Sequence, residues 1–565
     1  MKILLVAINA KYIHSNPAVY SLKAFTNREE VEIAEYTINN RREFVLSDLY
    51  QKHPDVLAFS CYIWNWSFIR ELLTDLKKLM PKVKIWMGGP EVSYDAKEIV
   101  TTREEIDGIM IGEGEQTFKN LANYYITGEG ELVHIPGIIA RKPNGNSLIM
   151  TQPQEIMDMN KIPFLYDTPE EFQNRIIYYE SSRGCPFRCS YCLSSIDKSI
   201  RFRSLALVKS ELKLFLEKKV KQVKFIDRTF NCNHEHAMEI WRFLLEWDNG
   251  VTNFHFEIAA DLLTEEEMSI LSKMRPGLVQ LEIGVQSTNS TTLQEINRVT
   301  DMNKLEQVVK EIVEWKTIHV HLDLIAGLPF EDYNSFKISF CNVYKMKPHQ
   351  LQLGFLKLLK GSIMHENAEK YGMIYSSLPP YEVFSTDWIR YDEILALKKI
   401  EEMVEIYYNT SQFTTTLKIL ETCFETSFLL FESLANFYEK NNYFIQMPSR
   451  VARYEILLDF MKEVDSERTE LYQEALTFDC YLRENMKSRP SFSKENIVTK
   501  EQLQLLKKEN HILEKQIHIE LFSYPVWNKV DQMKKGEARF ILFDYLNRDP
   551  LTYEASIKEL KSNET

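Results

Sequence analysis

The sequence predicts an α/β protein of three parts: a doubly wound parallel sheet, a partial (β/α) barrel and a mainly helical C-terminal domain. Short apolar runs alternate with helical patterns in two series, which is typical of parallel sheets with helical crossovers. A stretch without this alternation separates the two series. Beyond the second series glycine nearly vanishes and helical periodicity dominates. We therefore expect a first domain at 1–135, a connector at 136–173, a second domain at 174–375 and a helical domain at 376–565.

Composition supports several globular domains and disfavours some partners. The 565 residues are 44% hydrophobic and 26% charged, as in ordinary globular proteins. The net charge of −13 disfavours a nucleic-acid backbone as the main partner, because phosphates need a positive surface. No stretch approaches the length of a membrane span. Apart from three clustered cysteines the thiols stand singly, which is no disulfide framework and predicts a reducing cytosol.

The first domain should contain five parallel strands. The predicted strands are Ile3 to Ile8, Val31 to Tyr36, Val56 to Cys61, Val83 to Met87 and Gly108 to Ile111. In doubly wound sheets ligands lie beyond the carboxyl ends of the strands, so the loops there are the candidate ligand contacts. The candidates in these loops are Tyr12, His14, Tyr62, Trp64, Gly88, Gly89, Pro90, Gly112, Glu113 and Gly114.

The second domain should form the partial barrel. Its predicted strands are Arg175 to Glu180, Val223 to Thr229, Phe254 to Asp261, Val279 to Gln286, Ile318 to Ile325 and Gln350 to Leu356. Several of them alternate with a period of two between an apolar and a polar face. The polar faces carry His255, Glu257, Gln280, Glu282, Gln286, His319, His321 and Asp323. Ionisable groups facing a dry core cost several kcal/mol each unless paired, so we expect a wet or ligand-filled lumen.

Three cysteines follow the first barrel strand with the spacing Cys-x3-Cys-x2-Cys. Cys185, Cys189 and Cys192 can hold three irons of a cubane cluster and leave the fourth iron without a protein ligand. An open iron is where a substrate or cofactor coordinates. A structural zinc site is the alternative, but such sites want four ligands, typically in paired Cys-x2-Cys units.

The stretch from Ser181 to Cys192 resembles the signature of radical S-adenosylmethionine (SAM) enzymes. The resemblance implies a 4Fe-4S cluster whose free iron binds SAM, and an electron that cleaves SAM to a 5′-deoxyadenosyl radical. It also implies SAM contacts at Tyr191, Asp227, Glu257, Glu282, Gln286, Arg298 and Asp323. Arg298 matches the arginine that pairs with the SAM carboxylate. Asp227 stands where many relatives have a Gly-Gly-Glu-type turn for the SAM amino group.

The first domain resembles the cobalamin-binding domain of cobalamin-dependent radical SAM proteins. The resemblance rests on the order of elements and on the Gly88-Gly89-Pro90 and Gly112-Glu113-Gly114-Glu115 loops. It implies bound cobalamin. Many such domains carry Asp-x-His-x-x-Gly, whose histidine ligates cobalt, but His14 lacks both the Asp and the Gly. We therefore predict cobalamin without a protein histidine on cobalt, and a pocket contact for His14.

Together these features favour a cobalamin-dependent radical SAM enzyme, most of all a methyltransferase acting on a small molecule. Radical rearrangement or cyclisation with cobalamin is a second hypothesis. A non-catalytic corrinoid-binding or sensor protein is a third, and the cysteine triplet argues against it. The resemblance implies an external electron donor of the flavodoxin or ferredoxin type. The ligand faces of the two α/β domains should oppose each other.

Overall fold

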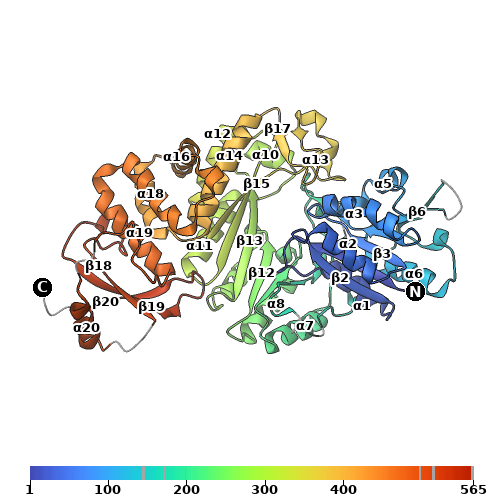
Figure 1. Cartoon of the computed structure of the whole chain (residues 1–565), viewed down its shortest axis with the longest axis horizontal. Helices are drawn as coiled ribbons and strands as arrows, with labels where there is room; N and C mark the ends of the chain where they lie inside the picture. Colours follow the sequence, from blue (N-terminus) through green and yellow to red (C-terminus); the bar gives the residue numbers. More distant parts are fainter. Residues whose placement is uncertain are drawn as a thin grey trace.

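The computed structural model describes residues 1–142, 147–166, 168, 172–197, 199–495, 498–511 and 516–560. Parts of the expected connector, at 143–146, 167 and 169–171, lie outside these residues. Figure 1 shows the N-terminal sheet at one end, the barrel strands in the middle and the C-terminal domain at the other end. None of the helices over the described residues combines the length and hydropathy of a membrane span.

The N-terminal domain is a doubly wound sheet, as predicted. Its parallel strands are β1 (Ile3–Asn9), β2 (Val31–Thr37), β3 (Val56–Ser60), β4 (Lys84–Gly88) and β5 (Gly108–Met110), in the order β2-β1-β3-β4-β5. One face is covered by α1 (Pro17–Thr26) and α6 (Gly114–Thr127), the other by α2 (Arg42–Gln51), α3 (Trp66–Leu79) and α5 (Ala96–Thr102). The strand order reverses beside β1, which marks the edge where such sheets bind ligands.

The N-terminal sheet extends beyond residue 135, where we expected the connector to begin. Strands β6 (Ile138–Arg141) and β7 (Leu148–Met150) continue it in antiparallel fashion from β5. They are too short to show a clear period of two in the sequence. Backbone pairing of β6 to β5, and of β7 to β6, makes them strands, and such pairing is decided by tertiary structure.

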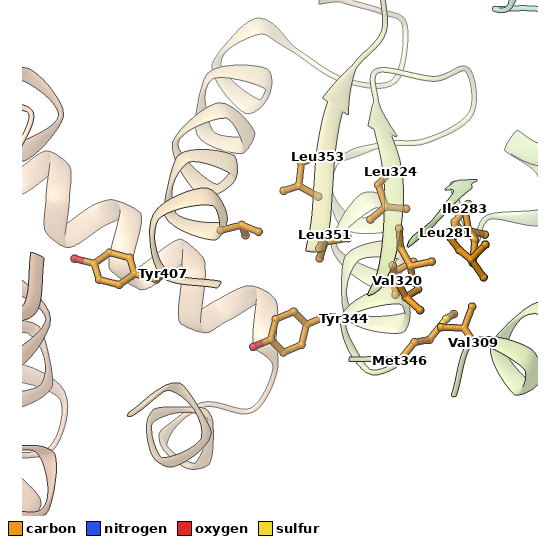
Figure 2. Close-up of a cluster of buried hydrophobic side chains, with 14 of the residues drawn as sticks. Leu281, Ile283, Val309, Val320, Leu324, Tyr344, Met346, Leu351, Leu353 and Tyr407 are labelled. Carbon is orange, nitrogen blue, oxygen red and sulfur yellow. The ribbon is translucent and has the colours of Figure 1, made fainter. Parts of the chain in front are cut away.

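The central domain is an open sheet of six parallel strands, which matches the predicted partial barrel. The strands are β8 (Ile177–Tyr179), β11 (Gln222–Phe225), β12 (Asn253–Ile258), β13 (Val279–Gln286), β14 (His319–Ala326) and β15 (Gln350–Phe355), in the order β15-β14-β13-β12-β11-β8. Their crossover helices are α7 (Leu205–Glu217), α8 (His234–Glu246), α9 (Glu265–Leu271), α11 (Met302–Trp315) and α12 (Tyr333–Tyr344). Figure 2 shows the apolar face of β13, β14 and β15 packed toward Val309 of α11 and Tyr344 of α12. The polar faces are thereby directed into the lumen, as the period-two pattern predicted.

The C-terminal domain is helical up to residue 483 and ends in a small sheet. The main helices are α14 (Tyr391–Met403), α15 (Thr414–Leu420), α16 (Ser427–Lys440), α18 (Arg450–Val464) and α19 (Thr469–Arg483). After α20 (Lys500–Glu509) come the antiparallel strands β18 (Ile517–Phe522), β19 (Arg539–Arg548) and β20 (Ala555–Leu560). The four central residues of β20 are exposed, so it carries little of the alternation between buried and exposed positions that reveals a strand in a sequence.

Candidate active site between the two α/β domains

The cysteine loop is closed at its base by a two-stranded ribbon. Strands β9 (Ser182–Arg183) and β10 (Arg201–Phe202) pair in antiparallel fashion, so the segment with the three cysteines begins and ends at the same ribbon. Gly184 begins the loop with a φ of 94°, and a Cβ there would lie 2.3 Å from the Ser199 carbonyl oxygen. Only glycine fits this position. All three cysteines of the loop are free thiols.

Three of the predicted SAM residues gather beside the cysteines. Arg298 Nη1 lies 3.8 Å from Cys189 Sγ and 3.5 Å from the Tyr191 hydroxyl, and its Nη2 donates to the Gly284 carbonyl. Burial raises the pKa of the Cys189 thiol, and Arg298 opposes this rise. Within the described residues, the buried Arg298 Nε and Gln286 Oε1 have no hydrogen-bond partner. Such atoms point to a polar ligand or water at this place.

The polar lumen holds a network of ion pairs from four neighbouring strands. Lys224 Nζ lies 2.8 Å from Glu282 Oε2, and His255 Nε2 lies 2.9 Å from the same oxygen. His321 Nε2 lies 2.9 Å from Asp323 Oδ1. The atoms of Glu282, His321 and Asp323 come within 4.8 Å of one another, a spacing that could suit a metal ion. Because the Lys224 ammonium already neutralises Glu282, we assign this group as an ion-pair network.

The carboxyl groups in the lumen differ in pKa, because their neighbours differ. Burial raises the pKa of Glu257 to about 7, with help from the negative charge of Glu282. Burial would also raise the pKa of Glu282, but His255 and Lys224 hold it well below its ordinary value. Burial lowers the pKa of His321, and Asp323 more than offsets this, so the net pKa is raised. Glu257 is therefore a lumen carboxyl that can change charge near neutral pH.

Asp227, a predicted SAM contact, is hydrogen-bonded within the chain. Its side chain is 1% exposed and accepts hydrogen bonds from the Ser181 backbone N–H at 3.0 Å, the Ser181 hydroxyl at 2.7 Å and the Ser182 hydroxyl at 2.5 Å. These donors occupy the carboxylate. Asp227 thus fixes the residues that lead into the cysteine loop. The sequence showed its place at a strand end but not its hydrogen-bond partners.

A cavity of about 350 Å³ lies where the N-terminal domain meets the barrel. The N-terminal domain contributes the ends of its strands, including Ser60, Gly88 and Gly112, and the helix residues Val19 and Gly114. The barrel and the segment before it contribute Phe164, Tyr166, Tyr178, Tyr179 and Ile226. The ligand faces of the two α/β domains therefore oppose each other, as expected from the sequence.

Family models match the three parts of the chain separately. The B12 binding domain matches residues 3–122, and the Radical SAM superfamily matches residues 179–339. The chain therefore contains a B12-binding domain followed by a radical SAM domain. Residues 369–543 match a third family, described as a protein of unknown function (DUF4080). The recognition of both cofactor-binding domains from the sequence is thereby confirmed.

Several curated relatives are methyltransferases by name, while others are named as an anaerobic magnesium-protoporphyrin IX monomethyl ester cyclase and a putative methylthiotransferase. The 2-(S-pantetheinyl)-carbapenam-3-carboxylate methyltransferase of Streptantibioticus cattleyicolor is 23% identical over 53% of this chain and 46% of its own. The cobalamin-dependent radical SAM methyltransferase TokK of Streptomyces tokunonensis is 23% identical over 57% of this chain and 50% of its own. The chain thus spans about half the length of the curated relatives it matches. The structure of the cobalamin-dependent SAM radical enzyme OxsB, with aqua-cobalamin and SAM bound, has a similar fold, with a TM-score of 0.59 at 14% identity over 84% of this chain and 78% of that one.

Two features account for glycine in the loops of the B12-binding domain: a tight turn and a place in the cavity wall. Gly89 has a φ of 112°, and a Cβ there would lie 2.4 Å from the Cys61 carbonyl oxygen, so its glycine is required by the turn itself. Gly88, Gly89, Pro90, Gly112 and Gly114 line the cavity, and their role as cobalamin contacts stays a prediction. Glu113 lines it as well, but Arg201 Nη1 donates to its carboxylate at 3.1 Å, so it is less free for a ligand than we expected.

The aromatic residues of the predicted cobalamin site lie at different depths. Tyr62 lines the cavity and stacks on Trp64, with ring centroids 4.3 Å apart. Trp64 is 44% exposed, and Tyr12 is 65% exposed under the Arg175 guanidinium. His14 Nδ1 lies 2.7 Å from the Tyr178 hydroxyl, and burial lowers its pKa. His14 thus makes a polar contact between the domains.

We expect a His14→Ala variant to keep its cobalamin and its electronic spectrum, because His14 is engaged by Tyr178 and lacks the sequence context of a cobalt ligand. The measurement is the spin-resonance spectrum of the Co(II) form. Nitrogen coupling that is present in the unchanged protein and lost in the variant would contradict the prediction.

Proposed function

We propose that this protein uses a 4Fe-4S cluster, SAM and cobalamin to methylate an unactivated carbon of a small-molecule substrate. The observation that carries the proposal is the shared interface: the cavity of the B12-binding domain and the cysteine loop meet at the same edge of the barrel. A reaction that needs a cluster, SAM and a corrinoid requires such opposed sites. The names of several relatives, among them two of the most similar, support methyl transfer, and the cyclase among the relatives keeps cyclisation as the alternative.

The residues present fit these cofactors. Cys185, Cys189 and Cys192 would hold the cluster, and the unpartnered atoms of Arg298 and Gln286 suit the polar end of SAM. Asp323 and Glu257 extend the polar wall, while Glu282 is held by Lys224 and serves the lumen network. The glycine loops that line the cavity would contact cobalamin, of which the cavity has room for a part. When bound, these groups supply an electron for SAM cleavage and a transferable methyl group.

The chain's own side chains do the orienting. Arg298, fixed by the Gly284 carbonyl and Tyr191, would hold a carboxylate beside Cys189. The apolar faces of β13 and β14 are buried in the core, so water is excluded from the side of these strands that faces away from the lumen. Glu257 can hold or release a proton near pH 7. The free thiols also support the reducing cytosol as the working compartment, where an external flavodoxin- or ferredoxin-type donor would supply electrons.

The test is product analysis with anaerobically reconstituted protein, SAM labelled with deuterium in its methyl group, a chemical reductant and the small-molecule fraction of an anaerobic cell extract. We expect one 5′-deoxyadenosine and one S-adenosylhomocysteine per labelled product that has gained a methylene. A product formed with 5′-deoxyadenosine alone and without this mass gain would favour rearrangement or cyclisation. Failure of the chain to cleave SAM at all would favour a sensor.

A further inference from the structure

Two arginines face each other at the base of the cysteine loop. Arg183 of β9 and Arg201 of β10 are register partners, and their side chains are 17% and 16% exposed. Two guanidinium charges this close repel each other, most strongly where water is excluded. The ribbon that closes the loop therefore needs carboxylates beside it.

The B12-binding domain supplies these carboxylates. Arg183 Nη2 donates to Glu115 Oε1 at 2.6 Å, and Arg201 Nη1 donates to Glu113 Oε2 at 3.1 Å. Both glutamates follow β5: Glu113 is the N-cap residue of α6, and Glu115 lies in its first turn. The radical SAM domain itself adds Glu180, whose Oε2 accepts from Arg183 Nε at 2.8 Å, and Asp197, whose Oδ2 accepts from Arg201 Nη2 at 3.0 Å.

The contact between Arg183 and Glu115 is the more deeply buried of the two. The Glu115 side chain is 6% exposed and also accepts from the Ser21 hydroxyl at 2.9 Å. Burial raises the pKa of Glu115, but Arg183 and Ser21 bring it below its ordinary value, so the carboxylate stays charged. Removing Glu115 would leave the buried Arg183 guanidinium with Glu180 at 2.8 Å and Glu113 at 3.6 Å, and the loss of one carboxylate beside a buried charge is destabilising.

We propose that Glu113 and Glu115 are positioning residues that lock the cysteine loop, through Arg201 and Arg183, against the B12-binding domain. Gly184 and Cys185 follow Arg183 directly, so a shift of Arg183 moves the first cluster ligand. The ion pairs thus set the distance between the cluster loop and the cobalamin loop. The catalytic consequence of these ion pairs rests on the proposed function. If the ion pairs are weakened, SAM should be cleaved without methyl transfer.

The test uses the full-length, anaerobically reconstituted protein with Glu113→Gln, Glu115→Gln and both together. Hydrogen exchange of peptides covering residues 184–200 is the main measurement, because it needs no substrate. We expect exchange in the double variant to be at least about tenfold faster than in the unchanged protein. The yield of 5′-deoxyadenosine per S-adenosylhomocysteine should rise in the same variant. Glu115→Asp keeps the charge and should restore part of the protection.

Asp107→Asn is the matched control, because Asp107 lies at the other end of β5 and pairs with Lys77 and Lys84, each at 2.9 Å. It should lower the melting temperature without changing exchange at 184–200. If the double variant behaves like this control, the glutamates are merely structural and the proposal is overturned. If exchange accelerates but even the unchanged protein makes no methylated product, the positioning role of the two glutamates is supported and the proposed function is wrong.

Discussion

Replacing Cys185, Cys189 and Cys192 together by alanine should remove the iron–sulfur cluster and abolish SAM cleavage. The unchanged protein, reconstituted without oxygen, should contain about four irons per chain, as a 4Fe-4S cluster requires. In the proposed site these three thiolates are the protein ligands of the cluster, so we expect no other residue to compensate for their loss. Iron content, the visible absorption of the cluster and 5′-deoxyadenosine formation are the measurements.

Cys341→Ala is the control for the cluster experiment, since Cys341 lies on α12 and is also a free thiol. It should keep both the cluster and SAM cleavage. A normal cluster in the triple variant would show the assignment wrong. Cys232 would then be the next candidate ligand; its thiol is half-buried, and burial and the charge of Cys185 raise its pKa.

Replacing Arg298 by alanine should weaken SAM binding about 10- to 100-fold, because hydrogen bonds to a charged group contribute about 1.5–3 kcal/mol each. The guanidinium is held by the Gly284 carbonyl and the Tyr191 hydroxyl beside Cys189. It is therefore aimed before a ligand arrives. SAM affinity is measured by equilibrium binding to the reconstituted protein, with cluster absorption recorded in the same sample.

Two further variants make the Arg298 result specific. Arg298→Lys keeps the charge but loses the paired donors, so its affinity should lie between those of the alanine variant and the unchanged protein. Arg275→Ala removes an arginine that pairs with Asp248 before β13 begins, at the opposite end of that strand. It should bind SAM normally. Unchanged affinity in Arg298→Ala, with the cluster intact, would remove Arg298 from the SAM site.

Much of the fold could be predicted because it depends on local patterns. The buried strands β1 and β3 are continuous apolar runs, and the alternation in β13 assigns Glu282 to the lumen and Ile283 to the core. Such patterns are dictated by the geometry of a strand, which turns successive side chains to opposite faces. Strands β6 and β20 could not be predicted from the sequence, because backbone pairing to β5 and β19 stabilises them more than their own residue pattern does.

The sequence by itself determined the chemistry of the site: the cysteine spacing, the polar lumen and the glycine loops are each readable within a few residues. Only the tertiary structure decided which polar groups are free. Asp227 is bound by two serines, Glu282 by Lys224, and Glu113 by Arg201. These partners lie far away along the chain, and a hydrogen bond depends on distance and direction in space. The same residue type can therefore hold a ligand or hold a loop, and the folded arrangement makes the choice.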